Sequence, residues 1–145
     1  KLLKILEMNL NSKVVYKKKA NLPGFHIFTS KSIFRYPIAS FHRDLQYNSL
    51  NWNSQCDNTK IISFTVPIYL PKDQSGLYIF NYSGDNILKA MNSEKDKYKY
   101  TIGKLYIHNG LNWHIIAPTF IDKGEYRITL QGHGLKCNDI WYIYW

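Results

Sequence analysis

The 145-residue chain contains little cysteine, few arginines and no long apolar run. Its two cysteines, Cys56 and Cys137, show neither C-x-x-C nor zinc-type spacing, which argues against a redox or zinc motif. We therefore expect both to be free thiols in a reducing, cytoplasmic setting. No apolar run reaches the length needed to cross a bilayer, and the opening KLLKILEMNL lacks the small-residue cleavage site of a signal peptide. These absences predict a soluble protein with no membrane partner.

The charge of the chain is strongly positive but comes mostly from lysine. The formal net charge is +9, and only three of the 19 basic residues are arginines: Arg35, Arg43 and Arg127. The lysines are scattered, so they do not by themselves predict a nucleic-acid partner. Because lysine is the default cation here, each arginine is a candidate for the planar, two-pronged contact that only guanidinium makes.

The length is typical of a single domain, and we expect residues 1–145 to form one domain. The chain begins at Lys1, so it could be a fragment that lacks N-terminal elements. Residues 1–10 have the apolar pattern of a short amphipathic helix or packed arm. Residues 85–97 could hold one helical turn or an exposed excursion. Turn residues separate eight runs rich in β-branched and aromatic residues, a pattern that predicts an all-β sandwich or barrel. These runs cover 25–30, 33–41, 61–70, 76–83, 98–109, 113–118, 125–134 and 140–145.

The stretch FHRDL places His42 two residues before Asp44. In an extended segment, the side chains of residues i and i+2 lie on the same face, so the imidazole and the carboxylate point toward the same region. The pair could bind a metal or be a solvated hydrogen-bonded pair. A metal would need a third ligand, and two histidines with one carboxylate suit ferrous iron with open coordination positions.

The candidates for the second imidazole are His26, His108, His114 and His133. His114 is the best placed, because it follows an N-G turn signal and begins the short apolar run HIIAP. His108 is a competing choice for that ligand or a half-buried sheet residue. His133, in QGHG, reads as a turn or mouth residue, and His26 as an ordinary strand residue.

Arg127 and Thr129 occupy alternate positions of the predicted strand EYRITL, so they share a face. A guanidinium can bond both oxygens of a carboxylate while a hydroxyl adds another donor. The alternative is an outward-facing Arg127 paired with Glu125 or Asp122.

The order of H-x-D at 42–44, then GKLYIHNGLNWHIIAP with its His before Pro, then R-I-T at 127–129, resembles the iron(II) and 2-oxoglutarate dependent oxygenases. RYPIASFHRD also looks like the stretch that leads to the first metal ligand in the prolyl-hydroxylase-like branch. The resemblance covers roughly residues 24–134.

The resemblance implies a double-stranded β-helix, also called a jelly roll or cupin-like barrel. It makes His42, Asp44 and His114 the catalytic iron(II) ligands, and Arg127 and Thr129 the grip on the distal carboxylate of 2-oxoglutarate. A further hydrogen bond to that carboxylate would come from Tyr36. The implied reaction uses O2, converts 2-oxoglutarate to succinate, and hydroxylates an unknown acceptor: a protein or peptide side chain or a small metabolite.

Two other functional readings stay open. The nucleic-acid demethylase branch of that family usually has a second arginine six positions after the first, where this chain has His133. We therefore do not expect a nucleic-acid substrate. The alternative from another class is a non-catalytic β-barrel binding module whose basic, Tyr-rich surface holds nucleic acid or carbohydrate.

Overall fold

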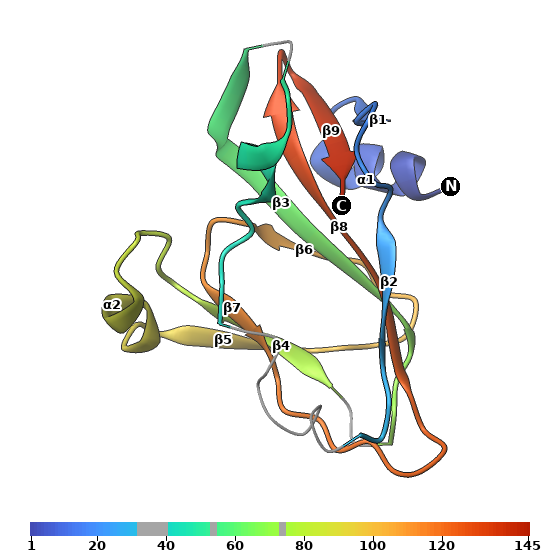
Figure 1. Ribbon diagram of the computed structural model, residues 1–145. Coiled ribbons are helices and arrows are strands. Elements are labelled where there is room, and N and C mark those ends of the chain that lie inside the picture. The colour runs from blue at the N-terminus through green and yellow to red at the C-terminus, as the bar shows by residue number, and fades with distance from the viewer. Residues whose placement is uncertain (32–40, 53–54, 73–74) are drawn as a thin grey trace.

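The computed structural model describes residues 1–31, 41–52, 55–72 and 75–145, and over these ranges the chain is mostly strand with few helices (Figure 1). The helical elements are α1 (Leu2–Leu10), the 3-10 turn η2 (Gln46–Ser49) and α2 (Ile87–Met91). The strands are β1 (Val14–Tyr16), β2 (Gly24–Phe28), β3 (Cys56–Tyr69), β4 (Gly76–Phe80), β5 (Lys95–Lys99), β6 (Tyr106–Asn109), β7 (His114–Ile116), β8 (Arg127–Cys137) and β9 (Ile140–Tyr144).

The larger sheet is built around the long antiparallel pair β3 and β8 (Figure 1). Its strand order is β1-β9-β8-β3-β6, and β2 pairs with β8 as well. Strand β9 pairs with residues 133–137 of β8 and β2 with residues 127–131, so the two follow one another along the same strand. The β8–β9 turn places Asn138 and Asp139 at φ angles of 47° and 63°, which these residue types tolerate in tight hairpins.

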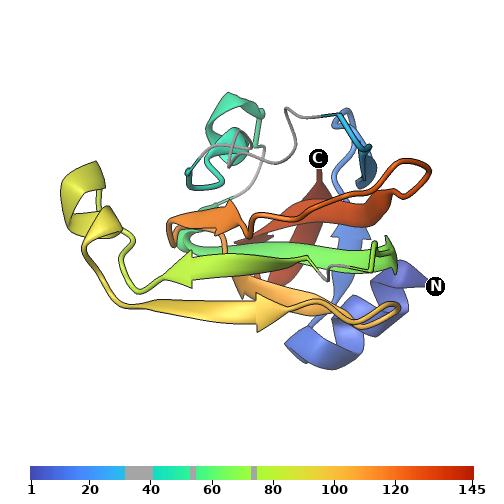
Figure 2. The same ribbon diagram turned by 90° about the horizontal axis from the view of Figure 1, so that it is seen from below.

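The smaller sheet has the order β5-β4-β7, with both pairs antiparallel (Figure 2). His42 bridges to His114 of β7 through two backbone hydrogen bonds, of 3.1 and 2.9 Å, in which each amide donates to the other carbonyl. The segment that carries His42 therefore lies along the edge of β7.

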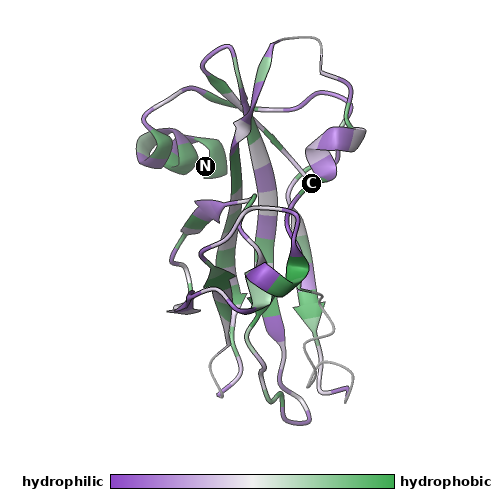
Figure 3. Cartoon of the chain, turned by 90° about the vertical axis from the view of Figure 1, so that its left-hand side faces the viewer, coloured by the Kyte–Doolittle hydropathy of each residue, from purple (hydrophilic) through white to green (hydrophobic). Residues whose placement is uncertain are grey.

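Alternation along β3 separates an apolar face from a polar one. Ile62 and Phe64 pack with Leu6 of α1 in a buried cluster, while Ser63 and Thr65 point to the opposite face. Apolar residues run along much of α1 (Figure 3). Full burial of a leucine such as Leu6 contributes about 1.5–3 kcal/mol to the free energy of folding. The helix thus covers one face of the larger sheet and leaves the other face for the site.

Most predicted elements are found, with differences at particular places. The predicted N-terminal helix is α1, and the 85–97 link holds α2 and the start of β5. The single strand predicted over 98–109 is wrong, because Lys99 ends a strand of the small sheet and Tyr106 begins one of the large sheet, with Gly103 turning at φ 77°. Strand β1 was not predicted. The run 33–41 falls almost entirely outside the described residues.

The prediction of two free thiols is wrong, because Cys56 and Cys137 form a disulfide. They are direct partners in the β3–β8 register, with Cα atoms 4.0 Å apart, although 81 positions separate them in sequence. Sequence spacing carries no signal for such a pairing. The crosslink stabilises the fold chiefly by restricting the unfolded chain, and it removes the thiol argument for a reducing compartment.

The described strands pair into two open sheets and not into a closed barrel. Within the described ranges, no helix has both the length and the apolar character that a membrane span requires.

Candidate metal and carboxylate site

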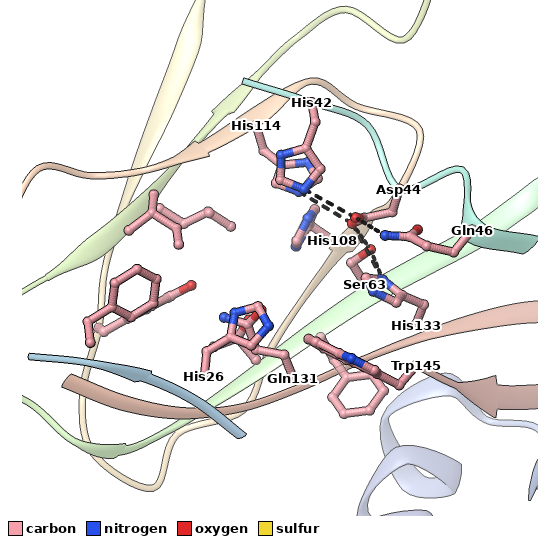
Figure 4. Close-up of a pocket in the computed structure, with 17 residues that line it drawn as sticks. His26, His42, Asp44, Gln46, Ser63, His108, His114, Gln131, His133 and Trp145 are labelled. Atoms are coloured by element: carbon pink, nitrogen blue, oxygen red, sulfur yellow. Dashed lines mark hydrogen bonds and ion pairs between the residues drawn. The ribbon is translucent and has the colours of Figure 1, made fainter. Parts of the chain in front are cut away.

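His42, Asp44 and His114 converge at one point (Figure 4). One potential ligand atom from each lies within 4.8 Å of the other two. The Nε2 atom of His42 is 3.4 Å from Oδ1 of Asp44, and Nε2 of His114 is 3.3 Å from Oδ2. The structure therefore brings together the three residues that the sequence singled out as a ligand set.

Backbone contacts hold this arrangement. The bridge between His42 and His114 ties the two histidine backbones, and the Asp44 amide donates to the Gly110 carbonyl at 2.9 Å. Nδ1 of His114 lies 2.8 Å from the carbonyl oxygen of Asn112. Because that oxygen can only accept, Nδ1 carries the proton, and the neutral ring presents the lone pair of Nε2 toward Asp44.

The charge state of Asp44 favours cation binding. Only 2% of the residue is exposed. Burial by itself raises the pKa of the carboxyl, but contacts with His133 and His42 outweigh it, so the pKa lies below the usual range for aspartate. Burial lowers the pKa of His114 more than the Asp44 charge raises it. A carboxylate beside a neutral imidazole is the protonation state that metal coordination requires.

A cavity of about 360 Å³ lies between the two sheets. The larger sheet lines it with Ser63, His108 and His133, and the smaller sheet with His114 and Ile116. His42 and Asp44 also line it, so the convergent triad forms part of its wall (Figure 4). The cavity gives the three side chains an enclosed space into which a metal and small ligands could fit.

Arg127 is buried beside this cavity, with 1% of its surface exposed. Its guanidinium lies 4.9 Å from the ring centre of Phe28 and 5.5 Å from that of Tyr100, two residues that line the cavity. The Nε atom donates to the Ser75 hydroxyl at 2.9 Å. Glu125 instead accepts from the backbone amides of Lys72 and Asp122. The outward pairing of Arg127 with an acid is therefore wrong.

Three polar atoms in or beside the cavity wall are buried without a hydrogen-bond partner among the described residues: the hydroxyl of Tyr100, which lines the cavity, and Nη1 and Nη2 of Arg127, which lies behind that lining. Burial lowers the pKa of Arg127, while Tyr100 acts in the opposite direction. Unpaired buried donors of this kind are costly, so they point to an acceptor that binds there. A carboxylate matches the geometry of the two guanidinium nitrogens.

Thr129 is fully buried on the same face of β8 as Arg127. Its hydroxyl accepts from Nε2 of Gln131 at 3.0 Å, which leaves its own proton available, but Gln131 and not Thr129 lines the cavity. Tyr36 lies outside the described residues.

The remaining histidines all line the cavity. His108 packs its ring 4.9 Å from that of His114, and its Nε2 is buried without a partner among the described residues. His133 contacts Ser63, and His26 lies edge-on to Trp145 with ring centres 4.6 Å apart. Their shared position was not predicted, since a lone strand histidine carries no sequence signal of the face it occupies.

Sequence reasoning also missed Ser63 and Tyr100. Ser63 had a usable signal, because Ser63 and Thr65 are alternate polar positions in the apolar run IISFTVPIYL. Tyr100 had none, since it is one of 12 tyrosines and only its burial sets it apart.

The titration of His108 predicts how stability depends on pH. Burial first, and the neighbouring His114 imidazole next, lower the pKa of His108 to about 3. An unfolded histidine titrates near pH 6.5. Between these values the unfolded chain binds a proton that folded His108 does not, so stability is full above about pH 6.5 and falls as the pH drops toward 3.

We expect urea unfolding of the metal-free protein to show a smaller loss of stability between pH 7.5 and pH 5 in His108→Asn than in the unsubstituted chain. Part of the loss will remain, because the pKa values of His26 and His114 are also lowered. An identical pH slope in both proteins would contradict the buried, neutral His108.

Comparison with known proteins gives a structural likeness only. No family model and no curated protein matches the chain. Two solved structures of a novel N-substituted L-amino acid dioxygenase from Burkholderia ambifaria AMMD, one in complex with alpha-KG, match it with a TM-score of 0.63 and 13% sequence identity. Each match covers 85% of this chain and 52% of the dioxygenase. The chain spans about half the length of this dioxygenase and shares its fold over that part.

Proposed function

We propose that the chain is an Fe(II)- and 2-oxoglutarate-dependent dioxygenase that hydroxylates a protein or peptide side chain or a small metabolite. The observation that carries the proposal is the convergence of His42, Asp44 and His114 on a cavity that is also lined by the two rings that contact the buried Arg127. The fold shared with alpha-KG-binding dioxygenases supports it.

Iron(II) fits the donor set of the triad. Two imidazoles and one carboxylate on one side of an octahedral ion leave three positions for other ligands. His42 and His114 would each bind through Nε2, and Asp44 through a carboxylate oxygen. Bound there, iron(II) supplies the site at which O2 is reduced while 2-oxoglutarate loses carbon dioxide to give succinate and the acceptor gains a hydroxyl group.

Arg127 would bind the distal carboxylate of 2-oxoglutarate. Ser75 fixes the guanidinium through Nε, so the two unpaired Nη atoms remain for the two carboxylate oxygens. The buried hydroxyl of Tyr100 is available as a further donor, and the proton of Thr129 as another. We keep Tyr36 as a contributor proposed from sequence alone.

We further propose that the two sheets are the two halves of a jelly roll. The His42–His114 bridge supports this proposal. It pairs the His42 segment with the free edge of β7, so that this segment takes the position of a fourth strand in the smaller sheet. The N-substituted amino acid of the structural neighbours is one acceptor class among small metabolites. No specific observation in the described part of the chain favours the alternative of a non-catalytic binding module.

The direct test is consumption of 2-oxoglutarate. We expect the protein with Fe(II) and O2 to convert 2-oxoglutarate to succinate slowly even without an acceptor, and Asp44→Ala to reduce this to background, because the carboxylate that would hold the metal is lost. Succinate is measured by mass spectrometry. The control is Asp96→Ala, which removes an exposed carboxylate on β5. Equal succinate from Asp44→Ala and the unsubstituted chain would contradict the ligand assignment.

Arg127→Lys tests whether Arg127 binds the distal carboxylate of 2-oxoglutarate. Lysine keeps the charge but loses the two-pronged contact, so we expect the Kd for 2-oxoglutarate to rise roughly 10- to 100-fold, the equivalent of about 1.5–3 kcal/mol. The matched control is Arg43→Lys. Arg43 lies outside the cavity lining, donates to the Ser83 carbonyl and pairs with Asp85. Anaerobic calorimetric titration of the Fe(II)-loaded proteins measures the Kd for 2-oxoglutarate of each variant. An unchanged Kd in Arg127→Lys would mean that another residue binds the distal carboxylate.

A further inference from the structure

The Asp44 carboxylate has a second set of contacts behind the triad. The Ser63 hydroxyl hydrogen-bonds to Oδ2 of Asp44, and Nδ1 of His133 lies 3.2 Å from the same Ser63 hydroxyl (Figure 4). His133 Nδ1 is 3.5 Å from Oδ2 of Asp44, too far for a good direct hydrogen bond. His133 therefore has a closer hydrogen-bonded route to Asp44 through Ser63, and its longer direct contact adds to that route.

The strand register places these groups in a line. Ser63 of β3 is the direct partner of His133 on β8 and of His108 on β6. Cross-strand partners lie on the same face of a sheet, so the three side chains form a row that faces the cavity beneath Asp44. The row is a product of the β3–β8 pairing, and a shift of one residue would turn Ser63 away from the site.

The direction of the hydrogen bonds follows from the charge of Asp44. The carboxylate oxygens of an ionised aspartate can only accept hydrogen bonds, so the single hydroxyl proton of Ser63 points to Oδ2 of Asp44. The Ser63 oxygen is then the acceptor for its other neighbour, and Nδ1 of His133 carries the donated proton. The order of donation is His133 to Ser63 to Asp44.

Packing around this chain leaves it little freedom. A Cβ atom at Gly110 would lie 2.9 Å from the Ser63 hydroxyl and 2.8 Å from Cγ2 of Ile61, so only glycine fits there beside the hydroxyl. The Trp145 ring stacks on His133 with ring centres 5.5 Å apart and planes 24° from parallel. Ser63 and His133 are thus each packed against a residue that is not one of the proposed metal ligands.

We infer that Ser63 and His133 are positioning residues that hold the Asp44 carboxylate in one orientation for the metal, an inference that rests on the proposed function. Partners of this kind fix the direction of a ligand lone pair, and their loss typically weakens metal binding or activity 10- to 100-fold. His133 acts through Ser63, so the two residues form one unit.

The test is titration of the metal-free protein with Co(II), a probe whose visible absorption reports ligand geometry without turnover. We expect Ser63→Ala to weaken Co(II) binding roughly 10- to 100-fold and to change the spectrum. His133→Phe, which keeps a ring to stack on Trp145, should weaken binding in the same direction. The double variant should bind about as weakly as Ser63→Ala alone, because both substitutions interrupt one chain of hydrogen bonds.

The matched control is Ser93→Ala, which removes a serine hydroxyl bonded to the Ala90 carbonyl at the end of α2. Its Co(II) affinity and spectrum should equal those of the unsubstituted chain. Circular dichroism shows whether each variant is folded, and His133→Phe carries the test by itself if Ser63→Ala does not fold.

The outcomes separate the inference from the proposed function. If the unsubstituted protein binds no Co(II), the metal site and this inference both fail. If it binds Co(II) and the folded variants bind equally well with the same spectrum, only the positioning role fails. If the double variant loses as much Co(II) binding free energy as the two single variants together, Ser63 and His133 act separately, and the inference that they form one unit is overturned.

Discussion

The antiparallel pairing of β3 with β8 is the constraint on which the rest of the structure depends. It runs from Cys56 opposite Cys137 to Tyr69 opposite Ile128. The same register places Ser63 beside His133 under the candidate metal site, while β8 carries Arg127 at its far end. With period-2 alternation, one ladder therefore sets both the hydrophobic face under α1 and the polar face of the cavity.

The face of the larger sheet that lines the cavity buries many side chains that can ionise or form hydrogen bonds. Asp44 has its charge compensated by neighbouring donors, which explains how a carboxylate with 2% exposure stays ionised. Arg127 is compensated only in part by Tyr100, and its two Nη atoms and the Tyr100 hydroxyl have no hydrogen-bond partner among the described residues. A protein keeps unpaired buried donors at a cost to its stability, and a bound carboxylate would remove that cost. The triad thus suits a cation, and the buried Arg127 and Tyr100 beside the same cavity suit an anion.

Much of the fold followed from sequence because alternation and turn residues are local signals. The strand around His114 and the strand that begins at Arg127 were both predicted from such patterns. The disulfide, the split of the 98–109 run between two sheets and the row His108, Ser63, His133 were not, because each depends on the register between distant strands. His42 and Asp44 stood out through their i, i+2 spacing, whereas Tyr100 is distinguished only by burial that appears after folding.

The proposed chemistry depends on one metal ion held jointly by His42, Asp44 and His114. The most direct measurement is X-ray absorption spectroscopy of the Fe(II)-loaded protein under anaerobic conditions, with His114→Ala for comparison. We expect a six-coordinate ion with scattering from two imidazoles in the unsubstituted protein and from one in the variant. An imidazole count that is the same in both proteins, or the absence of any bound iron in the unsubstituted protein, would contradict it.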